Sequence, residues 1–249
     1  MSSRLLQIHG GQLEIDELGS GSPVVYLHGI WDAHEDAFVE ELARSFSVTR
    51  LHLPGFGQST GDEKLQDVHD AIYWLLDALD AAGISEAALI GHCLGGMLAA
   101  ELAAVQPRRF PKLVLISPFG LWNGLHPTMD FFAASAAQLA EALHGPGAAA
   151  PLPGGQSLEE VVARAKAREV AARFLWPLPN RGLNKRIHRI TMPTLLVWGS
   201  EDGITPPDYG QDFRQLIPSS ELHVVQGAAH MPHLAQPQAV ATLVEAFLK

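Results

Sequence analysis

The chain has 249 residues, of which 47% are hydrophobic, and its formal net charge is −10 at pH 7. That length and apolar content suit one large folded domain, while the acidic balance disfavours nucleic acid and anionic membrane surfaces as partners. No apolar run reaches the length of a membrane span, residues 1–10 lack the apolar centre of a signal peptide, and a lone cysteine excludes internal disulfides. We therefore expect a cytoplasmic protein.

Short apolar runs bounded by Gly and Pro alternate with helical patterns along most of the chain. A first strand is expected within residues 1–10, and further strands are predicted at Gln12–Glu17, Pro23–Leu27, Val48–Leu53, Ala87–Ile90, Leu113–Ile116, Thr194–Trp198 and Glu221–Val225. Helices are predicted at Val68–Leu79, Leu94–Val105, Tyr209–Leu216 and Ala239–Leu248. Because alternating strands and helices need crossover connections, we expect a mostly parallel sheet with helices on both faces.

The segment 119–185 interrupts this alternation. It contains aromatic clusters, a Gly/Pro/Ala-rich stretch at 145–155, a helical pattern around Leu158–Phe174 and no strand pattern. We interpret it as a helical lid inserted after the sixth strand, with 145–155 as its most mobile part. Residues 1–118 and 186–249 would then form the core.

The strongest chemical motif is the sequence Gly91-His92-Cys93-Leu94-Gly95, which follows an apolar strand and opens a helix. A Gly-x-nucleophile-x-Gly turn presents the nucleophile at the carboxyl edge of a sheet, and its glycines avoid collisions in the sharp turn. The amino end of a helix and a nearby imidazolium both favour a thiolate. The motif alone leaves open a structural turn around a buried thiol.

Two loops after other strands supply candidate partners for Cys93. His28-Gly29-Ile30 could form an oxyanion hole, with one N–H group from Ile30 and the other from Leu94. We expect His28 itself to tie this loop together rather than transfer protons.

Asp202 follows the strand that ends at Gly199, and His230 follows the last strand. The order nucleophile, then acid, then histidine coincides with these positions after strands, so we predict Cys93 as nucleophile, His230 as base and Asp202 as the acid that orients it. His233 is the alternative base, and a turn-capping role is the alternative for Asp202.

With these motifs together, the chain resembles the α/β-hydrolase superfamily, in the branch that holds carbon–carbon bond hydrolases, small esterases and lactonases. The other matching segments are 53–59, 192–199, 206–209 and 229–233. The resemblance implies an α/β-hydrolase fold with a mostly parallel eight-stranded sheet, and its spacing favours Asp202 over Glu201 as the acid. Such agreement is specific for the fold and poorly specific for the substrate.

The chain departs from the family pattern at four positions. Cys93 stands where the family usually has Ser, His52 where it has Asp, Ala229 where it has Gly and Ala235 where it has Glu. We expect the last three to change loop packing more than chemistry. A cysteine nucleophile resembles dienelactone hydrolases and the much longer polyester synthases, and the sequence leaves open whether Cys93 is native or a Ser→Cys replacement.

We predict a hydrolase that cleaves an activated ester, thioester or lactone through an acyl-Cys93 intermediate. Three alternatives stay open: an acyltransferase that uses the same intermediate, a carbon–carbon bond hydrolase, and a ligand-binding member without catalysis. A small-molecule substrate with an apolar or aromatic acyl part is expected, bound by a monomer or homodimer. The predicted pocket residues are Trp31, Phe119, Trp122, Phe131, Phe132 and Trp176.

The sequence predicts no cofactor and no metal site. Its 12 histidines are scattered, and no His-x-x-x-His pair lies beside a carboxylate on a predicted helix. We expect His188, His223 and His233 to be surface or loop residues.

Overall fold

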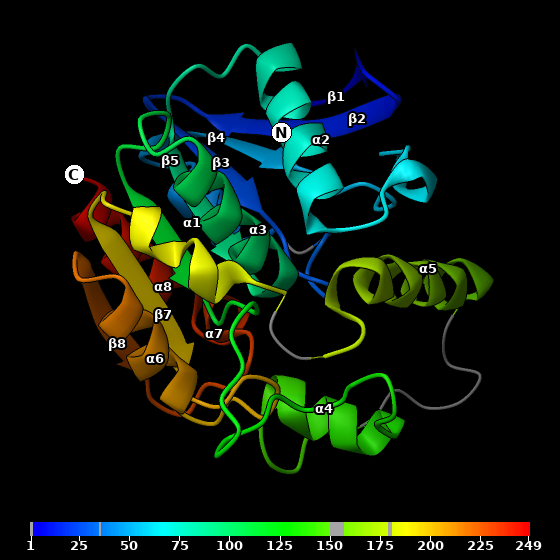
Figure 1. Ribbon diagram of the computed structural model, residues 1–249, viewed down its shortest axis with the longest axis vertical. Helices are drawn as coiled ribbons and strands as arrows, with labels where there is room; N and C mark the ends of the chain where they lie inside the picture. The colour runs from blue at the N-terminus through cyan, green and yellow to red at the C-terminus, as the bar shows by residue number, and fades with distance from the viewer. Residues whose placement is uncertain (1, 35, 150–156, 179–180) are drawn as a thin grey trace.

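The computed structural model describes residues 2–34, 36–149, 157–178 and 181–249 (Figure 1). Its centre is an eight-stranded sheet with the strand order β1-β2-β4-β3-β5-β6-β7-β8. The strands are β1 (Ser2–Ile8), β2 (Gly11–Gly19), β3 (Ser22–Leu27), β4 (Phe46–Leu51), β5 (Ala88–His92), β6 (Leu113–Ile116), β7 (Thr194–Gly199) and β8 (Ser220–Val225). Only β1 with β2 and β2 with β4 pair antiparallel, so six neighbouring strands form a parallel block.

Helices cover both faces of this sheet (Figure 1). The helices outside the 119–185 segment are α1 (Ala37–Leu42), α2 (Val68–Ala81), α3 (Cys93–Val105), α6 (Asp208–Leu216), α7 (Pro232–Ala235) and α8 (Pro237–Leu248). A short 3-10 turn, η1 (Asp62–Lys64), precedes α2. The mostly parallel sheet and its two helical layers are the predicted α/β-hydrolase fold, which is confirmed.

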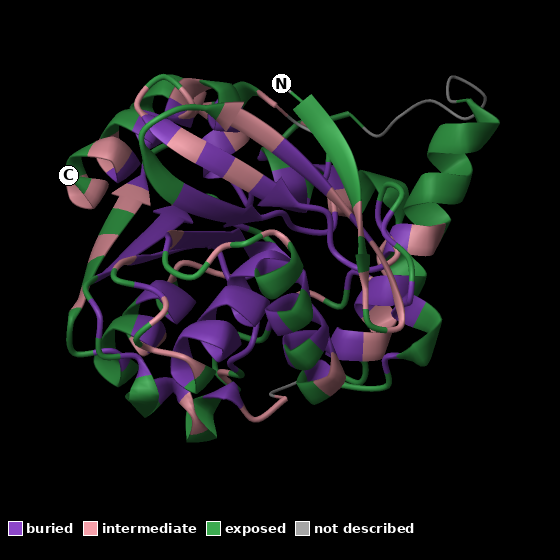
Figure 2. Cartoon of the chain, turned by 90° about the horizontal axis from the view of Figure 1, so that it is seen from above, coloured by how far each residue is buried: buried purple, intermediate pink, exposed green. Residues whose placement is uncertain are grey.

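Alternate residues of the central strands point to the two faces, as a period of two requires. In β5, Leu89 packs into the core that includes α2 and α3, and its neighbour Ile90 packs into the core that includes α1 and α8. Figure 2 shows the middle of the sheet buried and the outer sides of the helices exposed. These strands are therefore apolar throughout because both of their faces are covered.

The residues between β6 and β7 contain helices and, within their described part, no strand. They form α4 (Ala136–His144), α5 (Leu158–Leu175) and the 3-10 turns η2 (Leu183–Lys185) and η3 (Ile187–Arg189). Ser135 and Ser157 each begin a helix with a capping box. The division into a core and a lid at 119–185 stays a prediction, and residues 150–156 of the expected mobile stretch lie outside the described part of the chain.

All eight predicted strands are present, within about two residues at most ends. Three helices were not predicted: α1, α4 and α7. The Ser135-x-x-Gln138 pattern was an available signal for α4, since the two side chains cap its amino end reciprocally. α1 and α7 are only six and four residues long, too short to show a helical period.

Candidate active site

Cys93 lies at a tight turn between β5 and α3. Its φ of 55° is left-handed, a strained conformation for a side chain other than glycine. The flanking glycines explain why the backbone can turn there. A Cβ at Gly95 would lie 2.3 Å from the carbonyl oxygens of Leu27 and His28, and one at Gly91 would lie 2.4 Å from the carbonyl oxygen of Gly95. The strand-turn-helix context that the motif requires is therefore present.

Two backbone N–H groups face the sulfur of Cys93. They belong to Ile30, in the loop after β3, and to Leu94, the second residue of α3. Two converging donors of this kind form a site where negative charge on an oxygen could be stabilised. These are the two residues that the sequence predicted for an oxyanion hole.

The Cys93 thiol is fully buried. Burial raises the pKa of this thiol well above its ordinary value, against the opposing effect of the Ile30 and Leu94 N–H groups. Desolvation therefore opposes a thiolate more strongly than these two hydrogen bonds favour it.

His230 lies between an acidic side chain and the interior of the site. Its Nδ1 is 3.0 Å from both carboxylate oxygens of Asp202, and the ring is fully buried. Burial lowers the pKa of His230 below its ordinary value, although the Asp202 charge opposes that shift. A neutral ring with its proton on Nδ1 leaves the Nε2 lone pair available. Within the described residues Nε2 has no hydrogen-bond partner, so no bond joins it to Sγ here.

Asp202 is fixed by its own loop as well as by the histidine. Its Oδ1 accepts the N–H groups of Ile204 and Thr205 at 2.9 Å, and its Oδ2 accepts the Thr205 hydroxyl at 3.1 Å. The carboxylate is therefore held in one orientation toward Nδ1, as an orienting acid requires. The same bonds show that the turn-capping role considered for Asp202 is present too.

His28 has the structural role expected for it. Its Nε2 accepts the Leu53 N–H at 3.0 Å and its Nδ1 lies 2.7 Å from the Gly29 carbonyl oxygen, so both nitrogens are occupied within the loop. Burial lowers the pKa of His28 to about 3. A neutral ring with its proton on Nδ1 satisfies both contacts.

His233 was expected to be a surface or loop residue, and the structure shows it in the interior. It is the second residue of α7, only 1% of its area is exposed, and its Nε2 is hydrogen-bonded to Asp32. His188 and His223 are exposed, as expected.

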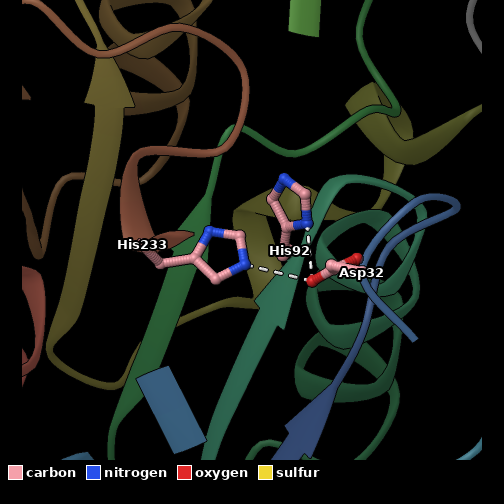
Figure 3. Close-up of side chains that lie close together, drawn as sticks. All are labelled: Asp32, His92 and His233. Atoms are coloured by element: carbon pink, nitrogen blue, oxygen red, sulfur yellow. Dashed lines mark hydrogen bonds and ion pairs between the residues drawn. The ribbon is translucent and has the colours of Figure 1, made fainter. Parts of the chain in front are cut away.

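Among the described residues, two groups of side chains lie close enough to offer a metal three ligand atoms within 4.8 Å of one another. They are Asp32, His92 and His233, shown in Figure 3, and Glu14, Asp16 and His52. In the first group His233 is hydrogen-bonded to Asp32, and His92 Nδ1 lies 3.0 Å from the same carboxylate oxygen. In the second, Arg50 already pairs with Asp16. The sequence indicated neither group, because each is assembled from separate loops and strands.

Five of the six predicted pocket aromatics gather above the site. Phe131 contacts Trp31, Phe119 and Phe132 with ring centroids 5.2, 5.8 and 4.1 Å apart, and Phe132 in turn contacts Trp176 at 5.6 Å. Trp31 and Phe119 also lie 5.7 and 6.0 Å from the ring of His230. Trp122 is 42% exposed and has no ring contact with this group in the described chain, so the structure does not bring it to the site.

The space beside these aromatics is small. A cavity of about 10 Å³ is lined mainly by apolar side chains from α3, the segment after β6 and the end of α5. Its residues are Met97, Phe119, Gly120, Leu121, Thr128, Leu175, Leu178 and Arg181. That volume holds about one water.

The model of the alpha/beta hydrolase fold matches residues 22–237. The chain belongs to this family. Among curated relatives, this α/β hydrolase is 26% identical to the pimeloyl-[acyl-carrier protein] methyl ester esterase of Aeromonas hydrophila, over 95% of this chain and 99% of that one. It is 29% identical to 2-hydroxy-6-oxononadienedioate/2-hydroxy-6-oxononatrienedioate hydrolase 2 of Pseudomonas putida, over 100% and 96%.

A third relative is far longer. Polyketide synthase ThaQ of Burkholderia thailandensis is 28% identical over 100% of this chain, which spans only 13% of ThaQ. Among solved structures, a bacterial membrane phospholipase A superposes with a TM-score of 0.84 at 22% identity, covering 99% of this chain and 85% of that one. Carboxylesterase CesB of Bacillus subtilis gives 0.78 at 20% identity, covering 99% and 91%. With hydrolases and esterases as full-length relatives, the chain is a hydrolase enzyme.

Within the described residues, no helix is both long and apolar enough to cross a membrane.

Proposed function

We propose that this α/β hydrolase cleaves activated esters, thioesters or lactones through a covalent acyl-Cys93 intermediate. The observations that support this proposal are a left-handed Cys93 with two backbone N–H donors at its sulfur, and a buried imidazole, His230, whose Nδ1 faces Asp202. A buried histidine with an unpartnered Nε2 is costly unless that lone pair has a use. A general base supplies that use.

The first step moves one proton and forms one bond. Nε2 of His230 takes the proton of the Cys93 thiol as Sγ attacks the carbonyl carbon of the substrate. Because burial disfavours both a resting thiolate and a resting imidazolium, the proton moves during attack rather than before it. Sγ and Nε2 come within bonding distance when substrate fills the site, as catalytic contacts often tighten on binding.

The negative charge that develops on the carbonyl oxygen falls between the N–H groups of Ile30 and Leu94. Each donor of this kind lowers the barrier by about 3–4 kcal/mol. His230, now an imidazolium stabilised by Asp202, gives its proton to the leaving group as the carbon–heteroatom bond breaks. A water molecule, deprotonated by His230, then cleaves the thioester and releases the acid and the thiol.

Cysteine at the nucleophile position restricts the leaving group. A thiolate leaves readily, so an adduct with a poor leaving group returns to starting materials by expelling Sγ. Thioesters, aryl or enol esters and strained lactones escape this return, whereas simple alkyl esters and amides do not. The acyl part would bind the apolar side chains beneath the aromatic residues, with Trp31 and Phe119 beside His230.

The test compares three substrates on the purified protein and its Cys93→Ala and Cys93→Ser variants. We expect turnover of p-nitrophenyl acetate and an acyl thioester, little of ethyl acetate, and none by Cys93→Ala. A mass increase on Cys93 after brief exposure to an activated acyl donor would detect the intermediate. Ethyl acetate hydrolysed as fast as the aryl ester, or an active Cys93→Ala variant, would contradict the proposal.

The Pseudomonas putida relative favours carbon–carbon bond hydrolysis as a second candidate. In that reaction His230, Asp202 and the N–H pair matter more than the nucleophile. A dienol-type diketone substrate distinguishes the two candidates, because Cys93→Ser should retain its cleavage while losing thioester exchange. The proposal also includes that the protein is cytoplasmic, is a monomer or homodimer, and has no nucleic-acid or membrane partner.

A further inference from the structure

Three polar side chains behind the active site converge on one carboxylate. Asp32 is 1% exposed, and its Oδ2 accepts the hydroxyl of Tyr26 at 2.5 Å. The same oxygen accepts Nε2–H of His233 at 3.1 Å (Figure 3). Nδ1 of His92 lies 3.0 Å from the same oxygen. The other oxygen, Oδ1, accepts the backbone N–H of Gly29 at 2.5 Å. This group of Asp32, His92, His233 and Tyr26 is called the Asp32 network below.

The Asp32 network touches each of the three loops that carry the reaction. Gly29 directly precedes Ile30, the oxyanion-hole donor in the loop after β3. His92 directly precedes Cys93 in the sharp turn. Nε2 of His92 lies 3.1 Å from the backbone carbonyl oxygen of His230. The base, the nucleophile and the oxyanion donor thus share one support, although none of their reacting atoms belongs to it.

Close packing around Gly29 is part of this arrangement. A Cβ at this position would lie 2.7 Å from Asp32 Oδ1, 2.7 Å from His92 Nδ1 and 2.8 Å from the Cβ of Cys93. Such approaches are shorter than side chains tolerate, so only glycine lets the three residues meet at this point. The Gly29 peptide is consequently fixed on one side by Asp32 and on the other by the nucleophile turn.

Both ring nitrogens of His92 have an oxygen atom as their nearest polar neighbour. Nε2 faces a carbonyl oxygen and Nδ1 faces a carboxylate oxygen, and both of these atoms are acceptors. A neutral ring would turn a lone pair toward one of them inside the protein interior. Two ring N–H groups would place a donor toward each of these acceptors. Nε2 makes a hydrogen bond, whereas Nδ1 lies 3.0 Å from Asp32 Oδ2 at angles outside those of a hydrogen bond, so a charge on the ring would act there as an ion pair.

The neighbouring His233 is a neutral imidazole. Burial lowers the pKa of His233 to about 4, so that ring is neutral and donates a single proton from Nε2. In the Asp32 network a neutral imidazole and a phenol are therefore hydrogen-bonded to the carboxylate, and His92 Nδ1 lies 3.0 Å from the same oxygen.

We propose that Asp32 and His92 form a buried ion pair that positions the oxyanion-hole donor and the catalytic base, with His92 doubly protonated in the resting enzyme. Both are positioning residues that act through the Gly29–Ile30 peptide and the backbone of His230. The kinetic part of this inference rests on the proposed function, whereas the charge state and the backbone contacts do not.

The first test is spectroscopic and independent of activity. In ¹⁵N-histidine-labelled protein at pH 7.5, two ring N–H signals should be assigned to His92 by their loss in His92→Gln. Asp32→Asn should remove one of them and shift the backbone amides of Ile30 and His230. Asp16→Asn is the matched control, because Asp16 is equally buried and contacts another histidine, His52, at 2.7 Å. It should leave those signals in place.

The second test is kinetic. The number of active sites is first measured by titration with an activated acyl donor. Per titrated site, kcat of Asp32→Asn on p-nitrophenyl acetate should fall about 10²-fold, as when one oxyanion donor is displaced. KM should change less than about threefold, because the donors act mainly in the transition state. The kcat of His92→Gln should fall by a similar factor. The kcat of the double variant should fall no further, since the two residues act as a pair. Asp16→Asn should keep kcat even where its Tm falls.

The outcomes separate this inference from the proposed function. A neutral His92, unmoved Ile30 and His230 amides in Asp32→Asn, or stoichiometric zinc in the purified protein would overturn the ion pair. An unchanged kcat per titrated site would overturn its positioning role. If the wild-type protein cleaves none of the substrates, the proposed function fails, and the spectroscopic test still decides the ion pair.

Discussion

Replacing Asp202 by asparagine tests the orientation of the base most directly. Oδ1 of Asp202 already accepts two backbone N–H groups, from Ile204 and Thr205, so the asparagine oxygen should stay in that place. The amide nitrogen then takes the place of Oδ2, 3.0 Å from Nδ1 of His230. An N–H donor at this point favours the tautomer with its proton on Nε2, and that tautomer cannot accept the thiol proton.

The size of the effect follows from this competition. Where an orienting aspartate becomes asparagine in a serine protease, kcat falls about 10⁴-fold because the wrong tautomer dominates. Here Oδ1 also lies 3.0 Å from Nδ1 and can still hold the productive tautomer in part. We therefore expect kcat to fall by about 10²–10⁴-fold, which corresponds to about 3–5 kcal/mol of barrier.

The assay is steady-state hydrolysis of p-nitrophenyl acetate, with the unfolding midpoint measured for each variant. Asp208→Asn serves as the control, since Asp208 lies in the same region, is half-exposed and contacts only His126, at 3.5 Å, among the ion pairs of the described residues. It should leave kcat unchanged. If a folded Asp202→Asn variant keeps kcat within about threefold of wild type, Asp202 does not orient the base.

Three further predictions concern pH, stability and access. Because burial lowers the pKa of His230, kcat/KM should rise with pH along an acid limb centred below the ordinary histidine value of 6.5, and a limb above 7 would contradict the buried neutral base. Burial lowers the pKa of His233 from 6.5 to about 4, so between pH 6.5 and pH 4 the unfolded chain binds a proton at this residue and the folded chain does not. The free energy of unfolding should therefore fall by about 3 kcal/mol as the pH drops through that window. Urea unfolding at pH 7 and pH 4 measures this, and a His233→Gln variant without a smaller pH dependence would refute it. Phe131→Ala should speed iodoacetamide alkylation of Cys93 about tenfold or more by opening the aromatic cover, whereas Phe110→Ala, also fully buried, should not; equal rates by mass spectrometry would show that Phe131 does not limit access.

The sheet was predictable because its signal is local. Runs such as Leu113–Ile116 and Thr194–Gly199 are apolar at every residue, which is typical of strands covered on both faces, and turns bound them. The Gly-x-Cys-x-Gly motif likewise specifies its own geometry, since only glycine fits where a Cβ would meet a carbonyl oxygen. The short helices α1 and α7 escaped prediction because their few residues pack by tertiary contact rather than by an intrinsic pattern.

Asp32 and His92 show what the sequence could not reveal. Both stand in the motifs that predicted the oxyanion hole and the nucleophile, yet nothing in their spacing says that they meet each other and the backbone of His230. A His-Gly-x-x-Asp pattern ahead of a Gly-His-Cys turn was the only hint. Their partnership depends on how three loops converge at the carboxyl edge of the sheet.

By itself, the sequence determined the family, the order of the strands and helices along the chain, and the residue types available for chemistry, because periodicity, glycine placement and motif order are written in neighbouring residues. Only the tertiary structure decided that burial raises the pKa of the Cys93 thiol, that Trp122 makes no ring contact with the other aromatics within the described residues, and that His233 is interior. Protonation and access depend on which atoms surround a group after folding, and residues far apart in the chain supply those atoms.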